Sequence, residues 1–310
     1  MKKLNVGVIM GGKSAEHEIS VLSGREVLKN LDRKKYQAFP ILIPKSGGLK
    51  LPKKKLDVVF IALHGPFGED GTVQGLLEFQ GITHTGSGIL ASSLGMDKQA
   101  FKRLLFSEKI KSPKYAALKK NKKELKEIVK KVGSPPYFVK PHNQGSSVGG
   151  SIVKKYKELS GALKFAFKYS DTVLVEDYIE GREITAAVIG NSKPRALPLV
   201  EIIPLKGDFF DYESKYTESG AKEITPAGIN PQLTRKIQEI ALRVYKLIGC
   251  RGFARVDFLI DKKGTPFVLE INTIPGLTPM SLFPKAAKAA GISYPKLLDQ
   301  IIAYAFKNVD

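Results

Sequence analysis

The chain has almost none of the residues that cross-link small secreted domains. Its 310 residues include a single cysteine, Cys250, which excludes an internal disulfide framework and a metal site built from several cysteines. No stretch approaches the roughly 20 consecutive apolar residues that a membrane helix needs. The first residues also lack a long apolar run that ends in a small-residue cleavage site. We therefore expect no signal peptide and a cytoplasmic location.

Acidic residues are scarce relative to basic ones. The chain has 50 lysines and arginines against 30 acidic residues, a net charge of +20, and such a surface can attract nucleic acid or another polyanion. However, the lysine clusters at 53–55 and 119–123 lack interleaved aromatic residues, and no zinc-finger, KH or RRM pattern occurs. Apolar residues recur at helical spacing around the second cluster, which places its lysines on the outer face of a helix. We favour solvated lysine-rich surfaces, with no nucleic-acid partner, over a polyanion-binding protein.

Residues 1–95 alternate between strand and helix patterns. Apolar runs predict strands at residues 5–10, 38–43 and 57–63. The last run is apolar throughout, as expected for a strand that is buried on both faces. Ser14 is positioned to cap the helix that follows the first strand. Strand–loop–helix repetition predicts a parallel sheet, so we expect ligand contacts from the loops at 11–16 and 64–71, at the carboxyl ends of the strands.

The rest of the chain divides into two regions. In residues 96–180, helix patterns combine with a strand on each side of the loop 141–150, which suggests a small α+β lid. Residues 181–310 alternate strands and helices. Within them, the polar stretch 206–229 has little periodicity, and a long loop of this kind in a compact domain is often a lid or a binding loop. The pattern predicts an α/β domain at 1–95 followed by two α+β domains.

Two predicted strands near the C-terminal end form a hairpin. Turn-forming residues separate the segments 255–260 and 267–272. A tight turn centred on Lys263 and Gly264 would place Lys262 opposite Thr265. One face of this hairpin would then be apolar and would carry Val256, Phe258, Leu269 and Ile271.

The other face of the hairpin carries two opposed carboxylates. Counting outward from the turn, Asp257 faces Glu270 and Arg255 faces Asn272. Opposed carboxylates repel each other unless a cation lies between them, and hard oxygen donors suit Mg²⁺ or Mn²⁺ together with phosphate oxygens. Arg255 would suit a phosphate or a developing oxyanion. The alternative, a solvated polar face with an Arg255–Asp257 surface pair, stays open on the local pattern alone.

A glycine- and serine-rich loop follows the strand that ends at Lys140. It contains Gly145, Ser146 and Ser147, whose backbone N–H groups and hydroxyls can approach an anion closely. Lys140 at the strand end could neutralise a phosphate. The loop joins two strands rather than opening a helix, so it is neither a P-loop nor a dinucleotide fingerprint. A flexible hairpin turn remains the alternative.

Four separated motifs match those of one family in content and order. They are the runs 11–18 and 64–75, the segment 255–257 together with 270–278, and the pair Lys215–Tyr216. On these residues the whole chain closely resembles the D-alanine–D-alanine ligases of the ATP-grasp superfamily. The resemblance implies the ATP-grasp fold with a Rossmann-like pre-ATP-grasp domain at 1–95, a central lid domain at 96–180 and a C-terminal catalytic domain at 181–310. ATP would lie between the last two domains.

The same resemblance implies an activity and a set of site residues. The activity would be ATP-dependent ligation of two D-alanines through a D-alanyl phosphate, for peptidoglycan synthesis, by a homodimer. Residues implied for the amino acids and the reacting groups are Glu16, His64, Ser146, Tyr216, Arg255, Gly276, Ser281 and Leu282. Residues implied for ATP are Lys98, Lys140, Ser147, Glu176, Ile179, Glu183 and Lys215. Two Mg²⁺ or Mn²⁺ ions would bind to Asp257, Glu270 and Asn272.

Roles within this set also follow from the resemblance. Glu16 would receive the ammonium group of the first D-alanine, and Ser281 would take the carboxylate of the second. Arg255 and the backbone N–H of Gly276 would stabilise the oxyanion. Taken singly, Glu16 could instead be an acid that favours a helix N-terminus, and Ser281 could be a helix N-cap.

The nearest competing activity is a related ligase that uses a D-hydroxy acid as its second substrate. Family members with that preference usually lack the tyrosine that this chain carries at Tyr216. Tyr216 therefore favours D-alanine as the second substrate.

Overall fold

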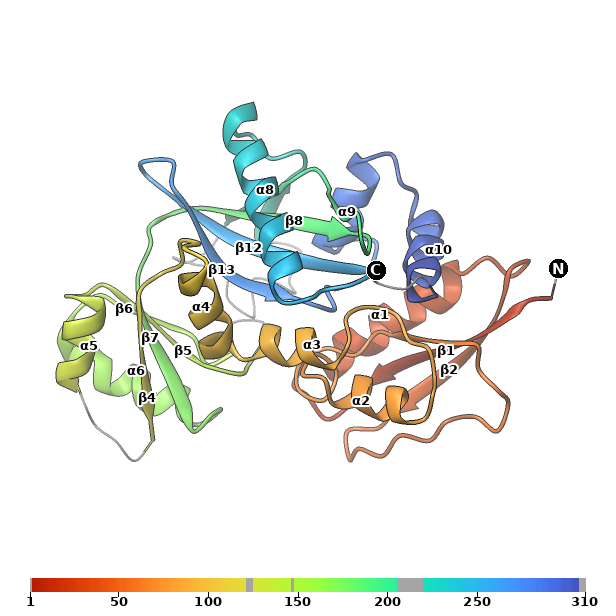
Figure 1. Cartoon of the computed structure of the whole chain (residues 1–310). Coiled ribbons are helices and arrows are strands. Elements are labelled where there is room, and N and C mark those ends of the chain that lie inside the picture. Colours follow the sequence, from red (N-terminus) through yellow and green to blue (C-terminus); the bar gives the residue numbers. More distant parts are fainter. Residues whose placement is uncertain (1, 121–124, 146–147, 206–219, 307–310) are drawn as a thin grey trace.

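The computed structural model of the chain describes residues 2–120, 125–145, 148–205 and 220–306. Within these ranges the strands form a three-stranded, a four-stranded and a six-stranded sheet. In Figure 1 the N-terminal sheet lies at one end of the molecule and the four-stranded sheet at the other, with the C-terminal strands between them. No helix of the described ranges is both long and apolar enough to cross a membrane.

The N-terminal sheet is parallel, as the strand–loop–helix pattern predicted. Its order is β2–β1–β3, with β1 at Leu4–Gly11, β2 at Tyr36–Ile43 and β3 at Val58–Ile61. Helix α1 (His17–Asn30) follows β1, and α2 (Thr72–Phe79) lies beyond the loop after β3.

Both faces of β3 are covered, which explains its continuous apolar run. Val58 and Phe60 belong to an apolar cluster that includes residues of α1 and of α10 (Tyr294–Ala305). Val59 and Ile61 belong to a second cluster, which includes residues of α2. The C-terminal helix α10 therefore completes the core of the N-terminal sheet.

The central sheet is antiparallel, with the order β4–β7–β5–β6. Its strands are β4 (Tyr115–Lys119), β5 (Tyr137–Pro141), β6 (Ser151–Val153) and β7 (Thr172–Asp177). Helices α5 (Leu125–Val132) and α6 (Leu159–Ala166), the latter preceded by a 3₁₀ turn at Tyr156–Glu158, pack on one face. The predicted strands that flank the glycine-rich loop are confirmed as β5 and β6. Strand β4 was not predicted, because its two alanines weaken the strand pattern.

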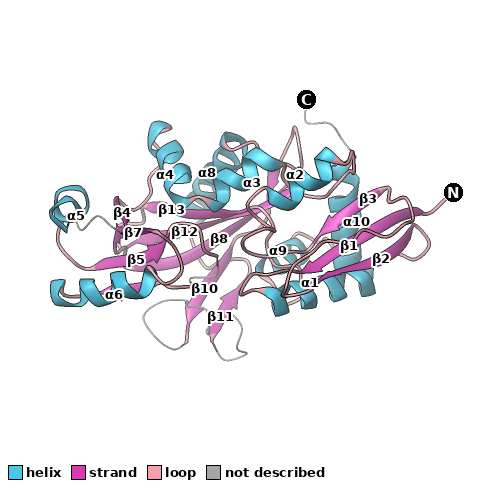
Figure 2. Cartoon of the chain, turned by 90° about the horizontal axis from the view of Figure 1, so that it is seen from below, coloured by secondary structure: helices cyan, strands magenta, loops and turns pink. Residues whose placement is uncertain are grey.

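The C-terminal sheet has the order β11–β10–β8–β12–β13, with β9 paired to β8. Its strands are β8 (Gly181–Ile189), β9 (Arg195–Ala196), β10 (Val200–Pro204), β11 (Ala221–Ile224), β12 (Phe253–Asp261) and β13 (Pro266–Asn272). Helices α8 (Pro231–Leu247) and α9 (Leu282–Ala289) pack against it. Figure 2 shows β10 and β11 extending from this sheet beside the central sheet.

Two helices connect the N-terminal sheet to the central sheet. They are α3 (Ile89–Met96) and α4 (Lys98–Ser107). Phe101 and Leu105 of α4 share an apolar cluster with Val256 and Phe258 of β12. Although α4 precedes the central sheet in the sequence, it therefore packs on the C-terminal sheet.

Part of the stretch 206–229 forms a strand instead of an irregular loop. Residues Ala221–Ile224 form β11, which pairs with β10 from Glu201 to Pro204. The expectation of an irregular loop is therefore wrong at 221–224, where four residues are too few to show a strand period. Residues 206–219 lie outside the described residues, and the lid expected there stays a prediction.

The β12–β13 hairpin has the predicted pairs around the carboxylates. Arg255 pairs with Asn272, and Asp257 pairs with Glu270. These facing positions are the ones counted from the sequence.

The turn of the hairpin differs from the prediction by one residue. The backbone N–H of Asp261 donates to the carbonyl of Thr265 at 3.0 Å, so Thr265 does not pair with Lys262. A β-bulge next to Asp257 compensates, and Phe258 faces Val268 instead of Leu269. The prediction that Asp257 pairs with Glu270 is therefore correct only because the one-residue error at the turn and the one-residue shift at the bulge cancel.

Candidate active site

Two adjoining cavities lie where the three sheets meet. The N-terminal cavity, about 320 Å³, lies between the start of α1, the loop after β3, strands β12 and β13, and the start of α9. The intersheet cavity, about 280 Å³, lies between the central and the C-terminal sheets. Lys98, Asp257 and Glu270 line both cavities. The two cavities therefore share part of their wall.

The described residues that the sequence assigned to a site all line these cavities. The N-terminal cavity contains Glu16, His64, Arg255, Asn272, Gly276, Ser281 and Leu282. The intersheet cavity contains Lys140, Glu176 and Ile179. Lys98, Glu183, Asp257 and Glu270 line both. Ser146, Ser147, Lys215 and Tyr216 lie outside the described residues.

Glu16 is held between two loops at the start of α1. Its residue is 7% exposed, and it occupies the N-cap position without a side-chain capping bond. A Cβ atom at Gly65 or Gly145 would come within 2.8 Å of Glu16 Oε2. The two glycines therefore let the loops after β3 and β5 approach the carboxylate closely.

The expected cap of α1 by Ser14 is wrong. Ser14 lies two residues before the N-cap, and its hydroxyl donates to the carbonyl oxygen of His64 at 2.6 Å. This bond ties the loop after β1 to the loop after β3. Ser14 thus supports the cavity wall rather than the helix end.

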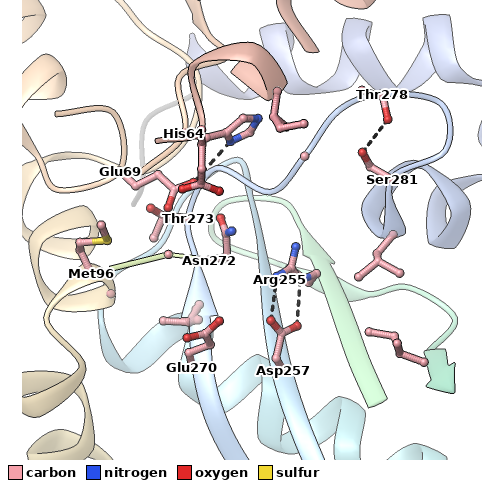
Figure 3. Close-up of a pocket in the computed structure, with 18 of the residues that line it drawn as sticks. His64, Glu69, Met96, Arg255, Asp257, Glu270, Asn272, Thr273, Thr278 and Ser281 are labelled. Atoms are coloured by element: carbon pink, nitrogen blue, oxygen red, sulfur yellow. Dashed lines mark hydrogen bonds and ion pairs between the residues drawn. The ribbon is translucent and has the colours of Figure 1, made fainter. Parts of the chain in front are cut away.

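His64 is fixed by contacts with two regions of the chain. Its Nδ1 lies 3.1 Å from the carbonyl oxygen of Ile274, and its Nε2 lies 3.1 Å from the hydroxyl of Ser23. Burial lowers the pKa of His64, but the nearby carboxylates of Glu69, at 3.4 Å, and Glu16 outweigh burial and raise it. Burial raises the pKa of Glu69. Figure 3 shows His64 above Glu69 in the cavity.

Arg255 and Asp257 form a buried, bidentate ion pair. Arg255 donates from Nε to Asp257 Oδ1 at 2.8 Å and from an Nη to Oδ2 at 2.7 Å. The hydroxyl of Thr185 donates to the same Oδ1 at 2.6 Å. Burial lowers the pKa of Arg255, but the Asp257 carboxylate outweighs burial and raises it. The pair seen in Figure 3 is therefore charged and preorganised, and it is not the surface pair considered from the sequence.

The residues predicted to bind metal offer oxygen donors of the right kind. Asp257 and Glu270 are opposed on the hairpin, and Lys98 Nζ lies 3.3 Å from Glu270 Oε2. Asn272 Oδ1 accepts the backbone N–H of Ile274 at 2.9 Å. No group of three or more His, Cys, Asp or Glu side chains suited to a metal occurs in the described ranges. Two carboxylates and one amide fit Mg²⁺ or Mn²⁺ only if ligands such as phosphate oxygens complete the shell.

The start of α9 forms one end of the N-terminal cavity. Ser281 is its N-cap but makes no side-chain capping bond. Its hydroxyl lies 2.8 Å from that of Thr278, and a Cβ atom at Gly276 would approach Ser281 Oγ to 2.9 Å. Backbone N–H groups at a helix start attract carboxylates. The helix end and these hydroxyls can together hold a small carboxylate.

The intersheet cavity combines apolar walls with buried charges. Phe138, Leu259 and Leu269 line it, so the expected placement of Leu269 on the core face of the hairpin is wrong. The bulge beside Asp257 interrupts the alternation of side chains between the two faces of the hairpin, and Leu269 turns to the cavity face. Glu176, 2% exposed, lies 3.1 Å from the Nζ atoms of both Lys102 and Lys140. Apolar walls beside lysines suit a flat base that carries phosphates.

Four polar residues of this region were missed from the sequence. They are Glu69, Lys102, Thr185 and Thr278. Lys102 had a local signal, because it lies one helical turn after Lys98. Thr185 had none, because only the pairing of β8 with β12 places it opposite Asp257.

Two antiparallel sheets that enclose a lysine-lined cavity are the arrangement of the ATP-grasp fold, and the adjoining second cavity has room for another molecule. The protein is thus an ATP-dependent ligase of the ATP-grasp class. Family models agree with this architecture. The model described as D-ala D-ala ligase N-terminus matches residues 5–53 and 48–87, and the one described as D-ala D-ala ligase C-terminus matches residues 104–303. The chain belongs to the D-alanine–D-alanine ligase family.

Relatives and solved structures cover nearly the whole chain. The chain is 44% identical to the D-alanine–D-alanine ligase of Pelotomaculum thermopropionicum, over 98% of each chain. Its structure is similar to a Bacillus anthracis D-alanine–D-alanine ligase in complex with ATP, with a TM-score of 0.81 and 35% identity over 97% of this chain and 96% of that one. It is also similar to the VanG D-Ala:D-Ser ligase of Enterococcus faecalis, with a TM-score of 0.89 and 34% identity over 98% and 100% of the two chains.

The two opposed carboxylates should differ in what they contribute to stability. Asp257→Asn leaves the buried Arg255 without its charged partner and should lower the free energy of unfolding by about 1.5–3 kcal/mol. Glu270→Gln should lower the free energy of unfolding by less. The Glu270 side chain is 24% exposed, so water can take the place of its charged oxygen beside Lys98. Urea denaturation without nucleotide measures both. Equal losses would contradict the ion-pair role of Asp257.

Proposed function

We propose that the protein joins two molecules of D-alanine in the cytoplasm, with conversion of ATP to ADP and phosphate, to supply D-alanyl-D-alanine for peptidoglycan. One observation carries this proposal: the two cavities share Lys98, Asp257 and Glu270. A nucleotide held between the sheets would present its γ-phosphate at this shared wall. An amino acid held by Glu16 would present its carboxylate to the same wall.

In the first step, the carboxylate of the first D-alanine attacks the γ-phosphorus of ATP. A P–O bond forms, the bond to ADP breaks, and a D-alanyl phosphate results. Glu16 pairs with the ammonium group of this D-alanine, so the carboxylate is oriented towards Lys98. Divalent ions held by Asp257, Glu270 and Asn272 would offset the negative charge of the triphosphate.

In the second step, the ammonium group of the second D-alanine loses a proton to solvent, and the resulting amine attacks the acyl carbon. A C–N bond forms, phosphate leaves from the tetrahedral intermediate, and the departing phosphate takes the second proton from the nitrogen. The start of α9 with Ser281 and Leu282 holds the carboxylate of the incoming D-alanine. Arg255 and the N–H of Gly276 face the developing oxyanion. Burial of Arg255 strengthens this interaction, because little solvent screens it.

Product formation tests the proposed function directly. With ATP and Mg²⁺, purified protein should release ADP and phosphate only when D-alanine is present, and the product should be the dipeptide. L-alanine should be inactive, and D-lactate or D-serine with D-alanine should be poorer second substrates. ADP release without D-alanine, or a preference for D-lactate, would overturn the proposal.

Glu16 should determine the affinity for the first D-alanine. Glu16→Gln keeps the size of the side chain but removes its charge. We expect kcat/KM for the first D-alanine to fall about ten- to a hundredfold, as for loss of one charge-assisted contact of about 1.5–3 kcal/mol. The KM for ATP should change little, because the nucleotide is held elsewhere.

The matched control is Glu18→Gln on the same helix. Glu18 pairs with Lys45 at 2.8 Å and is largely exposed. Steady-state kinetics at both D-alanine sites should show normal values for this variant. A loss of ATP affinity in Glu16→Gln, with the first D-alanine site intact, would contradict the assigned role.

We further propose that two copies of the chain associate through α2 and α3. Four apolar side chains of these helices are exposed, namely Leu76, Phe79, Ile89 and Leu90. Phe79 is 92% exposed and Leu90 is 69% exposed. Neighbouring exposed apolar residues of this size are typical of an interaction surface, and the same surface on a second copy can cover them with two-fold symmetry.

The association can be tested with one charge in this surface. Phe79→Asp should shift the protein from dimer to monomer in sedimentation velocity, because a buried unpaired carboxylate is unfavourable. Leu42→Asp is the control, since Leu42 is also exposed but lies on β2, at the far edge of the sheet. Identical sedimentation of both variants would disprove this interface.

A further inference from the structure

One lysine of the site region is completely buried and has no role in the reaction described above. Lys102 of α4 has an exposed fraction of 0%. Its Nζ donates to the hydroxyl of Ser112 at 2.7 Å and to the carbonyl oxygen of Pro113 at 3.0 Å. The same Nζ lies 3.1 Å from Glu176 Oε1. Burial of a charged lysine is unfavourable in free energy, so the presence of Lys102 at this place needs an explanation.

Lys102 connects two parts of the fold that enclose the intersheet cavity. Helix α4 packs on the C-terminal sheet through Phe101 and Leu105. Glu176 lies on β7 and Lys140 on β5, both in the central sheet. The ion pair from Lys102 to Glu176 therefore joins the C-terminal core to the central sheet.

Glu176 is shared by two lysines with different surroundings. Its Oε1 faces Lys102, and its Oε2 lies 3.1 Å from Lys140 Nζ. Lys140 lines the intersheet cavity, whereas Lys102 does not. When an anion enters the cavity, Lys140 can turn towards it while Lys102 keeps the Glu176 carboxylate neutralised. Without Lys102, the same movement of Lys140 would leave the buried Glu176 carboxylate without a cation beside it.

We propose that Lys102 is a positioning residue for the nucleotide, which acts by neutralising Glu176 so that Lys140 is available to the triphosphate. The inference rests on the proposed ATP-dependent function. The sequence places Lys102 one turn after Lys98, whose Nζ donates to the carbonyl oxygen of Gln144 at 2.7 Å in the glycine-rich loop. Through Lys98 and Lys102, helix α4 thus contacts both the loop after β5 and Glu176, the acid beside Lys140.

The charge on Lys102 is sensitive to weakly alkaline pH. Burial lowers its pKa to about 8, although Glu176 opposes this effect. The groups that face Lys102 are Glu176 and Asp177 of β7, Lys140 of β5 and the ring of Tyr115 on β4, 5.7 Å from Nζ. Below this pKa Lys102 is charged and Glu176 is neutralised. Above it the charge is lost, and Lys140 becomes the remaining cation beside Glu176.

The main test replaces Lys102 by an uncharged residue of similar length. Lys102→Met should weaken binding of a non-hydrolysable ATP analogue, measured by calorimetry at pH 7, by about tenfold or more. The KM for ATP should rise in parallel, with kcat and the KM values for D-alanine nearly unchanged. Arg103→Met is the control, because Arg103 is exposed on the same helix. A folded Lys102→Met protein with normal analogue affinity would overturn the inference, even if its thermal stability were lower.

A double variant tests whether Lys102 acts through Glu176. In a Glu176→Gln background, Lys102→Met should change the analogue affinity by less than about twofold, because no carboxylate remains to be neutralised. A full additional loss in that background would contradict the mechanism.

The pH dependence of analogue binding tests the inference on the unmodified protein, so this test does not depend on whether a variant folds. Its affinity for the ATP analogue should weaken as the pH rises from 7 to 9, and an unchanged affinity would overturn the inference. These binding measurements need no D-alanine. If the protein binds the analogue but forms no dipeptide, the proposed function fails while the role of Lys102 in nucleotide binding is still tested.

Discussion

Charge pairing beside the two cavities is the condition on which the site depends. Asp257 is paired with Arg255, Glu270 with Lys98, and Glu176 with Lys102 and Lys140. A carboxylate buried without a cation would cost several kcal/mol. Because each of these three acids has a basic neighbour, their carboxylates can stay charged beside the cavities. Lys98, Lys140 and Arg255 line the cavities, so they are available to phosphates and oxyanions when these enter.

The pairs of Lys98 and Lys102 exist because distant parts of the chain are packed together. Both lysines lie on α4, whereas their partners Glu270 and Glu176 lie on β13 and β7. Helix α4 packs on the C-terminal sheet but carries its lysines towards the central sheet. The N-terminal sheet is joined in a similar way, since His64 contacts the carbonyl oxygen of Ile274 and α10 completes the core beside β3. Sheet packing therefore determines which charges meet.

Local pattern was enough to locate most elements, and it failed where the backbone is irregular. The pairing of Asp257 with Glu270 was predicted correctly, but only because the offset at the turn and the bulge beside Asp257 cancel. At Leu269 they do not cancel, so a residue expected in the core lines the intersheet cavity instead. Ser14 failed as a cap because its hydroxyl bonds to the carbonyl oxygen of His64, fifty residues away. Both of these errors arise from a contact or a bulge that strand and helix periods cannot reveal.

The sequence by itself determined the parallel N-terminal sheet, the motifs that carry the family resemblance, and the placement of the two carboxylates on adjacent strands of one hairpin. Side-chain alternation and turn chemistry are local, and local rules can be read without coordinates. Only the tertiary structure decided that Thr185 bonds to Asp257 and that Lys102 lies buried beside Glu176. These contacts join residues 72 and 74 positions apart along the chain. These side chains meet because sheet pairing and helix packing bring them together, and no spacing in the sequence indicates either contact.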